Sequence, residues 1–463
     1  MLYEKLLEYV QSGVYPMHMP GHKRAGDSAA MPHNIDITEI HGFDNLHDPR
    51  GILLETTNLA AELYGSDRAF LLVNGSTVGI LAAIGACTQR GDKILMARNC
   101  HISVYNAVAL FNLIPIYISP EIDEETGISC GIATADVKSA LKKNPDVRLV
   151  VITSPTYEGV LSDTEAIAET AHAQGIPILI DAAHGAHLNF LSSLQNRISA
   201  RETADISVMS LHKTLPALTQ CALLHIRGER VDPREVARQL SIFQTTSPSY
   251  VLLASIDKCL RDLRDDSGRL FAEYEQKLAR FRSETECLQN LQILSIGDAQ
   301  DPGKIVIGTK KTAISGVELS DILREEHKIE LEMACADYAL AMTSVCDSAE
   351  GFARLSKALI AIDASLQTAA DCRKPLLLPS IPIQADMPYN ALTRRGEFIP
   401  LDKSAGLMSL EYIWAYPPGI PIIAPGEIIG ADVISYINRS VYAEVGIKST
   451  MGKLPQFIYA SGS

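Results

Sequence analysis

The sequence predicts an α/β protein with a large, mostly parallel sheet, a smaller α/β domain and a compact C-terminal domain. Short apolar runs alternate with helical segments of about 10 to 15 residues through the first half of the chain, which is the pattern of successive βαβ units. Polar side chains stand directly after three of these apolar runs, at Asn74, Asp181 and Ser210. Because open parallel sheets bind ligands at the carboxyl ends of their strands, we expect a binding site at this edge.

The predicted elements follow one another in a regular order. A helical pattern begins near Leu53 and ends at Gly65, a residue type that favours the end of a helix. A strand from Ala69 then turns at Gly75 into a helix that runs from about Val78. Further strands are predicted at 93–97, 115–118, 147–153, 176–180, 221–226 and 304–307, and further helices at 134–143, 164–174 and 251–288.

These elements indicate four stretches of chain. Residues 1–50 form an N-terminal arm that begins with a helical stripe of apolar residues. The large domain covers residues 51–288, and the small α/β domain covers residues 289–372. A proline-rich linker around 374–382 leads to a C-terminal domain at 383–463.

The composition excludes several classes of protein. The chain has 463 residues, of which 21% are charged, and a formal net charge of −14, so we expect neither nucleic acid nor an anionic membrane as a partner. No apolar run approaches the ~18 residues of a membrane span, and the N-terminus lacks the apolar core of a signal peptide. The nine cysteines form no CxxC pair, which is typical of reduced thiols. We therefore expect a cytoplasmic protein.

Lys213 is the centre of the predicted site. It follows an apolar run in the sequence Ser-Leu-His-Lys, and Asp181 follows the apolar run before it. The turn at 75–77 opens a helix and offers hydroxyl and backbone N–H groups at its positive end. A lysine, an acid and a helix N-terminus together suit pyridoxal 5'-phosphate, which needs a Schiff base, a partner for its pyridinium nitrogen and a phosphate site.

Other chemistries fit the sequence less well. His184 and His187 stand three residues apart, but no carboxylate or cysteine completes a recognisable zinc spacing. We therefore expect no metal. No GxGxxG follows a predicted strand, which disfavours a dinucleotide site, and no GxSxG elbow is present for a serine hydrolase.

The chain resembles the ornithine/lysine/arginine decarboxylases, which are pyridoxal-phosphate enzymes of the aspartate-aminotransferase-like fold. The likeness runs from about residue 13 to 430. It is carried by motifs at 17–22, 72–77, 98–101, 154–159, 181–187, 210–213, 245–250 and 416–426. The longer members of that family carry an N-terminal response-regulator-like domain that builds large assemblies. This chain begins directly at a short arm, so decamers are not expected.

The resemblance assigns catalytic roles to Lys213, His101 and Asp181. Lys213 would carry the cofactor covalently, Asp181 would face the pyridinium nitrogen, and His101 would stack on the cofactor ring. Thr246 and Ser247 would reach the site of the opposite subunit, which implies a homodimer or a dimer of dimers. The full set expected around the cofactor is Gly75, Ser76, Thr77, His101, Asp181, His184, Ser210, His212, Lys213, Thr246 and Ser247.

The resemblance also implies the substrate, a basic amino acid that is arginine, lysine or ornithine. Glu332 matches an acid that contacts the distal cationic group in the family. Asp337 stands where relatives often have an aromatic residue, so the particular amino acid stays open, with arginine slightly favoured. Asp44, Asp48 and Glu55 are weaker candidates for the same contact.

Two hypotheses of different classes follow. The first is decarboxylation of a basic amino acid to its amine, which would serve polyamine biosynthesis or acid resistance. The second is another reaction at the α-carbon, such as transamination or aldol cleavage, or a regulatory homologue without catalysis. The intact set of Lys213, Asp181 and His101 argues against a regulatory homologue. No arginine stands in a recognisable clamp for the α-carboxylate, which argues against a transaminase.

Overall fold

The structure is a computed structural model. It describes residues 13–18, 21, 23, 35–123, 125–194, 204–296, 299–367, 379–415, 420–442 and 446–461. The helix predicted at the N-terminus, much of the proline-rich linker and the start of the motif at 416–426 lie outside these residues.

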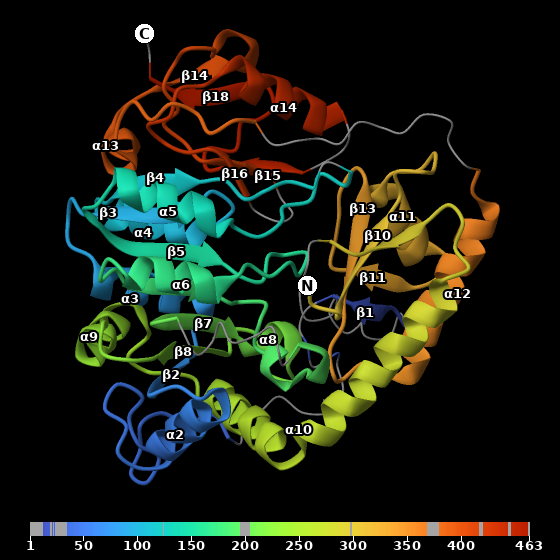
Figure 1. The fold of residues 1–463 in the computed structure, drawn as a ribbon, viewed down its shortest axis with the longest axis horizontal. Helices are drawn as coiled ribbons and strands as arrows, with labels where there is room; N and C mark the ends of the chain where they lie inside the picture. Colours follow the sequence, from blue (N-terminus) through green and yellow to red (C-terminus); the bar gives the residue numbers. More distant parts are fainter. Residues whose placement is uncertain are drawn as a thin grey trace.

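A seven-stranded sheet forms the centre of the molecule (Figure 1). Its strand order is β2-β8-β7-β6-β5-β3-β4. The central strands run parallel, and only β8 is antiparallel to both of its neighbours, which confirms the mostly parallel sheet. The strands are β2 (Arg68–Leu72), β3 (Lys93–Ala97), β4 (Ile114–Ile118), β5 (Val147–Thr153), β6 (Ile178–Asp181), β7 (Ile206–Ser210) and β8 (Ala222–Ile226).

Most helices of this part connect successive strands of the large sheet, whereas α2 precedes β2 and α9 follows β8. They are α2 (Ile52–Tyr64), α3 (Gly75–Cys87), α4 (Ile102–Leu110), α5 (Thr134–Lys143), α6 (Thr164–His172), α8 (Leu211–Thr214) and α9 (Pro233–Phe243), with short 3-10 turns η1 (Leu188–Phe190) and η2 (Ser192–Leu194). Helix α3 lies close to the sheet because Gly79 has no side chain. A Cβ at Gly79 would stand 2.7 Å from Leu72 Cδ1 and 2.8 Å from Val208 Cγ1. The sequence did not predict α9, and α3 begins at Gly75 rather than near Val78.

The long helix α10 (Tyr250–Thr285) leads from the large sheet to a smaller α/β part (Figure 1). That part has an antiparallel sheet in the order β12-β13-β10-β9. In addition, β1 (Tyr15–Met17) pairs in parallel with β11 (Ile329–Leu331), which attaches the N-terminal arm to this part. Its other elements are β9 (Gln292–Leu294), β10 (Lys304–Gly308), α11 (Gly316–Glu325), β12 (Met333–Ala334), β13 (Tyr338–Met342) and α12 (Ala349–Ser365).

The C-terminal unit, residues 379–461 as described, has its own hydrophobic core around Ile413, Val433 and Ile458. Figure 1 shows it above the β3–β4 edge of the large sheet. Its elements are α13 (Pro388–Thr393), β14 (Glu397–Pro400), η3 (Leu401–Lys403), β15 (Ile413–Ala415), β16 (Ile420–Ile423), α14 (Ala431–Tyr442), β17 (Ile447–Ser449) and β18 (Phe457–Ala460). The domain boundaries expected from the sequence stay a prediction. Within the described ranges, no helix combines the length and the apolar character that crossing a membrane requires.

Candidate active site

Lys213 lies on α8, the single helical turn that follows β7. All of β7 is buried, so the strand fixes where the turn begins. The Lys213 side chain is half-buried, and its Nζ lies 2.9 Å from Nε2 of His184. Desolvation lowers the pKa of Lys213, and the charges of Asp181 and Glu332 oppose this change only in part. The amine therefore loses its proton more readily than an ordinary lysine.

Asp181 ends β6, the strand beside β7, where its backbone lies opposite Val208. Its carboxylate is buried and accepts a hydrogen bond from the Ala183 N–H at 3.2 Å. His101 lies just beyond β3 and caps α4 by accepting from the Ser103 N–H at 3.2 Å. Burial lowers the pKa of His101, and the charges of Asp181 and Lys213 act on it in opposite directions. The structure thus brings these three predicted residues into one electrostatic group.

His184 lies between two lysines. Its Nε2 faces Lys213, and its Nδ1 lies 2.7 Å from Nζ of Lys304. The ring also packs on Tyr157, with 4.7 Å between the ring centroids. Burial, then the charges of Lys213 and Lys304, lower the pKa of His184 well below its ordinary value. The ring is therefore neutral at physiological pH.

Sequence reasoning missed Lys304, which it treated only as the start of a strand. The residue is 1% exposed at the beginning of β10, and burial lowers its pKa to about 8. Lys304 is the one charged residue of this apolar strand, and this weak signal is what the sequence offered for singling it out.

The start of α3 and the turn with Lys213 meet at the same segment of chain. The Gly75 N–H donates to the Gln220 carbonyl at 2.9 Å, and Nδ1 of His212 lies 2.9 Å from the Cys221 carbonyl oxygen. Gly75 has φ of +75°, so its lack of a side chain is required by the backbone. The Ser76 side chain is half-buried and that of Thr77 is exposed. The hydroxyl groups of Ser76 and Thr77 are therefore accessible to a ligand at the N-terminus of α3.

Two buried hydroxyls near this segment lack partners. Among the described residues, Ser210 Oγ and Thr214 Oγ1 are buried without a hydrogen bond. Buried hydroxyls of this kind usually have a partner. A phosphate would supply acceptors for them, Lys213 could hold an aldehyde, and Asp181 could face a pyridinium nitrogen. The residues present therefore fit pyridoxal phosphate.

Thr246 and Ser247 are exposed on the segment between α9 and α10. Beside them, the Thr245 N–H donates to Oδ1 of Asn74 at 3.2 Å, and Asn74 is the residue that precedes α3. This segment therefore lies next to the helix start proposed to bind phosphate. The side chains of Thr246 and Ser247 themselves are exposed to solvent in the single chain.

Glu332, in the stretch between β11 and β12, belongs to the same electrostatic group as Lys213. The Tyr157 hydroxyl donates a short hydrogen bond to its carboxylate. The charge of Glu332 also acts on the pKa of Lys213 and Lys304, and on that of Lys23. Glu332 is thus placed to face a cation in this site.

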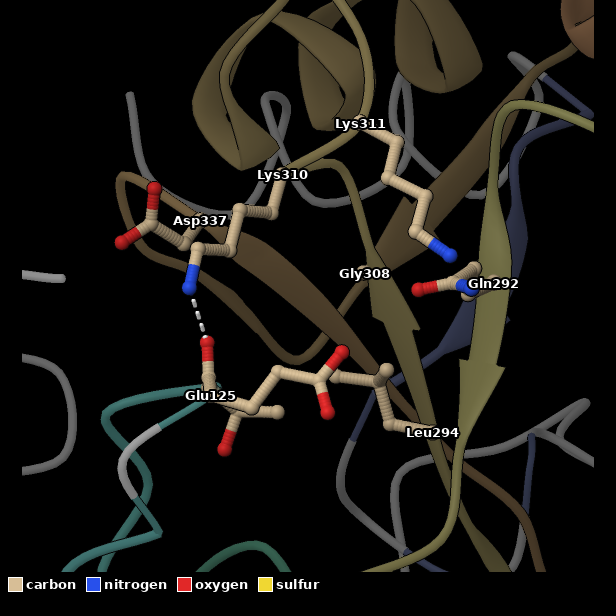
Figure 2. A pocket seen from close by; sticks show the side chains of 8 residues that line it. Glu125, Gln292, Leu294, Gly308, Lys310, Lys311 and Asp337 are labelled. Carbon is tan, nitrogen blue, oxygen red and sulfur yellow. Dashed lines mark hydrogen bonds between the residues drawn. The ribbon is translucent and has the colours of Figure 1, made fainter. Parts of the chain in front are cut away.

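The weaker candidates for that contact lie elsewhere. Asp44 caps α2, because its carboxylate accepts from the N–H groups of Arg50, Gly51 and Leu53 at 2.6 to 3.2 Å. Asp48 is exposed and pairs with Arg50. Asp337 lines a separate cavity of about 110 Å³ in the small part. Figure 2 shows it there with Glu125, Gln292, Leu294, Gly308, Lys310 and Lys311.

Gly21, within the motif at 17–22, contacts the Lys213 turn directly. The Gly21 N–H donates to the His212 carbonyl at 2.6 Å, and a Cβ at Gly21 would stand 2.7 Å from Leu215 N. Glycine is therefore required for this close approach. Lys23 is buried and donates to the His18 carbonyl at 2.9 Å. His22 of the same motif lies outside the described residues.

The histidines do not form a metal centre in the parts of the chain that the structure describes, where no three His, Cys, Asp or Glu side chains converge as metal ligands would. His187 is buried and its Nε2 lies 3.1 Å from Oδ1 of Asp301.

A lysine after β7, an acid at the end of β6 and a helix N-terminus at one sheet edge define an enzyme of the aspartate-aminotransferase-like fold. Two solved structures share this fold. The lysine decarboxylase LdcF of Francisella novicida matches with a TM-score of 0.76 and 20% identity, over 90% of this chain and 73% of that one. The ureidoglycine-glyoxylate aminotransferase of Bacillus subtilis matches with a TM-score of 0.56 and 15% identity, over 71% of this chain and 89% of that one.

The chain belongs to the Orn/Lys/Arg decarboxylase family. Residues 1–302 match the major domain of that family, and residues 371–444 match its C-terminal domain. The arginine decarboxylase of Bacillus subtilis (strain 168) is 36% identical over 470 residues, covering 96% of this chain and 94% of the other. The protein is therefore a decarboxylase of a basic amino acid, in a family of pyridoxal-phosphate enzymes.

Proposed function

We propose that the protein binds pyridoxal phosphate on Lys213 and decarboxylates arginine to its amine. The observation that carries this proposal is the position of the Lys213 amine, which lies after β7, 2.9 Å from the neutral ring of His184, in the field of Asp181. An amine held without its proton is a nucleophile for an aldehyde. The unpartnered hydroxyl of Ser210 and the start of α3 supply the phosphate site.

The chain's own residues do three things in this scheme. Asp181 would hold a proton on the pyridinium nitrogen, because a buried carboxylate stabilises a cation beside it. His101 and the N-terminus of α3 would orient the ring and the phosphate. When bound, pyridoxal phosphate supplies the electron sink that accepts the electrons released as carbon dioxide leaves. Lys213 then holds the proton that replaces the carboxylate.

Arginine is the proposed substrate for two reasons. The near-full-length relative from Bacillus subtilis is named an arginine decarboxylase. In addition, Glu332 offers a carboxylate to a guanidinium, which prefers two parallel hydrogen bonds from such a group. Tyr157 holds that carboxylate through its hydroxyl.

We propose further that the active unit is a homodimer or a dimer of dimers. A groove of about 780 Å³ lies beside the β2 edge of the sheet, between α2 and α9. Leu54, which lines the groove, is a large apolar side chain that is exposed, as are Ile52 at the start of the same helix and Ile40 and Phe43 in the segment before it. A second copy would cover this surface and bring its own Thr246 and Ser247 to the phosphate site.

The test is an assay of the purified protein with pyridoxal phosphate and, in turn, arginine, lysine and ornithine. Carbon dioxide and the amine should appear fastest with arginine. Borohydride reduction followed by mass spectrometry should find the cofactor on Lys213, and Lys213→Ala should lose both the visible absorbance and essentially all turnover. Trapping on another lysine, or ketoacid in place of the amine, would refute the proposal.

A further inference from the structure

Three side chains from distant parts of the sequence form a line. Lys304 at the start of β10, His184 after β6 and Lys213 on α8 are joined by contacts of 2.7 and 2.9 Å. Lys304 is 1% exposed and His184 is 5% exposed. The established family activity and the site proposed above give Lys304 no role. A lysine costs free energy when its ammonium is buried, so its position needs a reason.

Counting protons along this line fixes the charges. A neutral imidazole has one N–H donor and one acceptor nitrogen, and an ammonium can only donate. With both ring nitrogens of His184 against lysines, only one lysine can be an ammonium. The other must be a neutral amine that accepts from the ring N–H. A protonated ring would require both lysines to be neutral, and the lowered pKa of His184 opposes that state.

Lys304 is the better place for the charge. Its Nζ also donates to the Tyr157 carbonyl at 3.1 Å and lies 5.5 Å from the centroid of the Tyr157 ring. Asp301, Glu332 and Glu158 all favour its charged form. Lys213 has two such acids in range, Asp181 and Glu332. Lys304 therefore donates to His184 Nδ1, and the Nε2–H faces the free amine of Lys213.

We propose that Lys304 is a positioning residue for the reaction, the charged end of a buried proton relay that runs through His184 to Lys213. The proposal rests on the proposed function of Lys213. At rest, the relay presents an N–H to Lys213 and so keeps that amine unprotonated, ready to bind an aldehyde.

The relay can also return a proton. Decarboxylation replaces the carboxylate of an amino acid by hydrogen, so each turnover takes up one proton as carbon dioxide leaves. One proton passes from Lys304 Nζ to His184 Nδ1, while the Nε2 proton passes to Lys213 Nζ. The ring stays neutral and changes tautomer, and the positive charge moves from Lys304 to Lys213. Between turnovers, Nδ1 of His184 returns its proton to Lys304 while Nε2 takes up one proton from water on the Lys213 side, which restores both the ammonium of Lys304 and the resting tautomer of the ring.

Other titratable groups face the relay from each packed element. They are Asp181 at the end of β6, Glu158 after β5, Asp301 before β10, Glu332 before β12, His101 before α4 and His212 on α8. The acids among them favour one positive charge, whether it is on Lys304 or on Lys213. Within the described chain, the two hydrogen-bonding contacts of the His184 ring are those to Lys213 and Lys304, so the two lysines set its tautomer.

The first experiment measures attachment of the cofactor without substrate. Apoprotein is mixed with pyridoxal 5'-phosphate across a pH series, reduced with borohydride and analysed for modified Lys213. In Lys304→Met, the Nε2 of His184 can accept, so an ammonium on Lys213 gains a partner and its pKa rises. The pH of half-maximal attachment should rise by about 1 unit or more. Lys310→Met, a lysine on the loop after the same strand, should leave it unchanged.

Three results of this experiment would overturn the relay. They are a midpoint within about 0.3 units of wild type, a lower midpoint, or a folded Lys304→Met protein that takes no cofactor at any pH. If wild type attached the cofactor elsewhere, the proposed function would fail instead. His184→Gln breaks the same line at its middle and should raise the midpoint similarly. Adding Lys304→Met to it should then change little, because the two substitutions remove one coupled unit.

The second experiment separates the charge from the proton. Arginine keeps the positive charge but does not release its proton. Lys304→Arg should therefore keep the wild-type attachment midpoint while kcat falls at least about 10-fold, since positioned proton transfer contributes roughly 10²-fold or more. Lys304→Met should change both. Wild-type kcat in Lys304→Arg and Lys304→Met would overturn the proton-return step.

Discussion

Arg98 and Glu427 form a buried, two-pronged ion pair that joins the C-terminal unit to the large sheet. Arg98 Nη1 donates to Oε1 at 2.6 Å and Nη2 donates to Oε2 at 2.9 Å. Their side chains are 8% and 0% exposed, and the guanidinium lies 4.7 Å from the centroid of the Tyr117 ring. Arg98 follows β3 and stands three residues before His101. The pair therefore anchors the C-terminal unit close to the loop that places His101.

Glu427→Gln should loosen this anchor. It leaves the Arg98 guanidinium buried without its counter-ion, which typically costs about 3 kcal/mol or more. Trp414 on β15 is the one tryptophan of the chain, so its fluorescence reports unfolding of the C-terminal unit in urea. As a control, Asp266→Asn breaks the exposed pair with Arg269 and should cost less than about 1 kcal/mol. Equal effects of the two substitutions would contradict the proposed anchor.

A double variant tests the same pair from the other side. Replacing both partners, Arg98→Met with Glu427→Leu, leaves no uncompensated charge. Such replacements are often close to neutral, so the double variant should recover most of the stability that Glu427→Gln loses. If the double variant were less stable than Glu427→Gln, the packing of these side chains rather than their charges would attach the C-terminal unit to the large sheet.

Asp181→Ala should impair catalysis more than cofactor binding. The change removes the buried negative charge beside the pyridinium nitrogen, and losing one such electrostatic contact typically lowers the rate ~10²-fold or more. Turnover and cofactor affinity are measured on the same preparation. Asp205→Ala is a matched control, since Asp205 is equally buried at 2% but lies before β7, at the opposite end of the strand. It should affect stability and leave kcat of the folded protein near wild type. Near-normal decarboxylation by Asp181→Ala would refute the electron-sink arrangement.

The sequence predicted the ends of β6 and β7 well because the apolar runs of these two strands are fully buried. Asp181 and Lys213 come directly after such runs, so local pattern was enough to place both at one sheet edge. Parallel strands have their carboxyl ends at the same edge of the sheet, so the two residues were predicted to lie close together although they are distant in sequence. His101 also follows a predicted strand, and the family resemblance gave it a role beside the cofactor. The resemblance alone added Glu332, which no local pattern would single out.

Lys304 was missed for a physical reason. A lysine before an apolar strand ordinarily points to water, and nothing in the residues around it indicates burial. Its neighbours His184 and Tyr157 come from loops more than a hundred positions away, so only the docking of β10 against the large sheet creates the contact. Asp44 is the opposite case, a residue that the sequence offered as a contact for the substrate. Its carboxylate instead accepts hydrogen bonds from backbone N–H groups at the start of α2.

A mixed dimer tests whether Thr246 and Ser247 serve the neighbouring subunit. Lys213→Ala should be inactive, and the Thr246→Ala/Ser247→Ala variant should impair the site of its partner. Random pairing gives half heterodimers with one complete site each, so the mixture should regain up to about a quarter of wild-type activity. Activity is compared before and after subunit exchange. No gain over the sum of the parents, or a fully active monomer in sedimentation, would contradict the shared site.

The last prediction concerns Glu332, which lies nearer to Lys213 than the role of a distal contact suggested. Its charge raises the pKa of Lys213, so Glu332→Gln should shift the pH of cofactor attachment slightly downward. The bound cofactor's spectrum at a pH well above that midpoint should stay unchanged. The pH of the assay must therefore be fixed before substrate binding is compared.

Under those conditions, Glu332→Gln should raise the KM for arginine roughly 100-fold, because removing one partner of a buried charge pair costs about 2 to 5 kcal/mol. The substituted amide would keep an acceptor for the Tyr157 hydroxyl, so the pocket itself should remain. Asp337→Asn is the matched control, since Asp337 lines the separate cavity of Figure 2 and should leave KM unchanged. A rise in KM for Asp337→Asn alone, with the same preference among arginine, lysine and ornithine in Glu332→Gln, would show that a different group recognises the cation of the substrate.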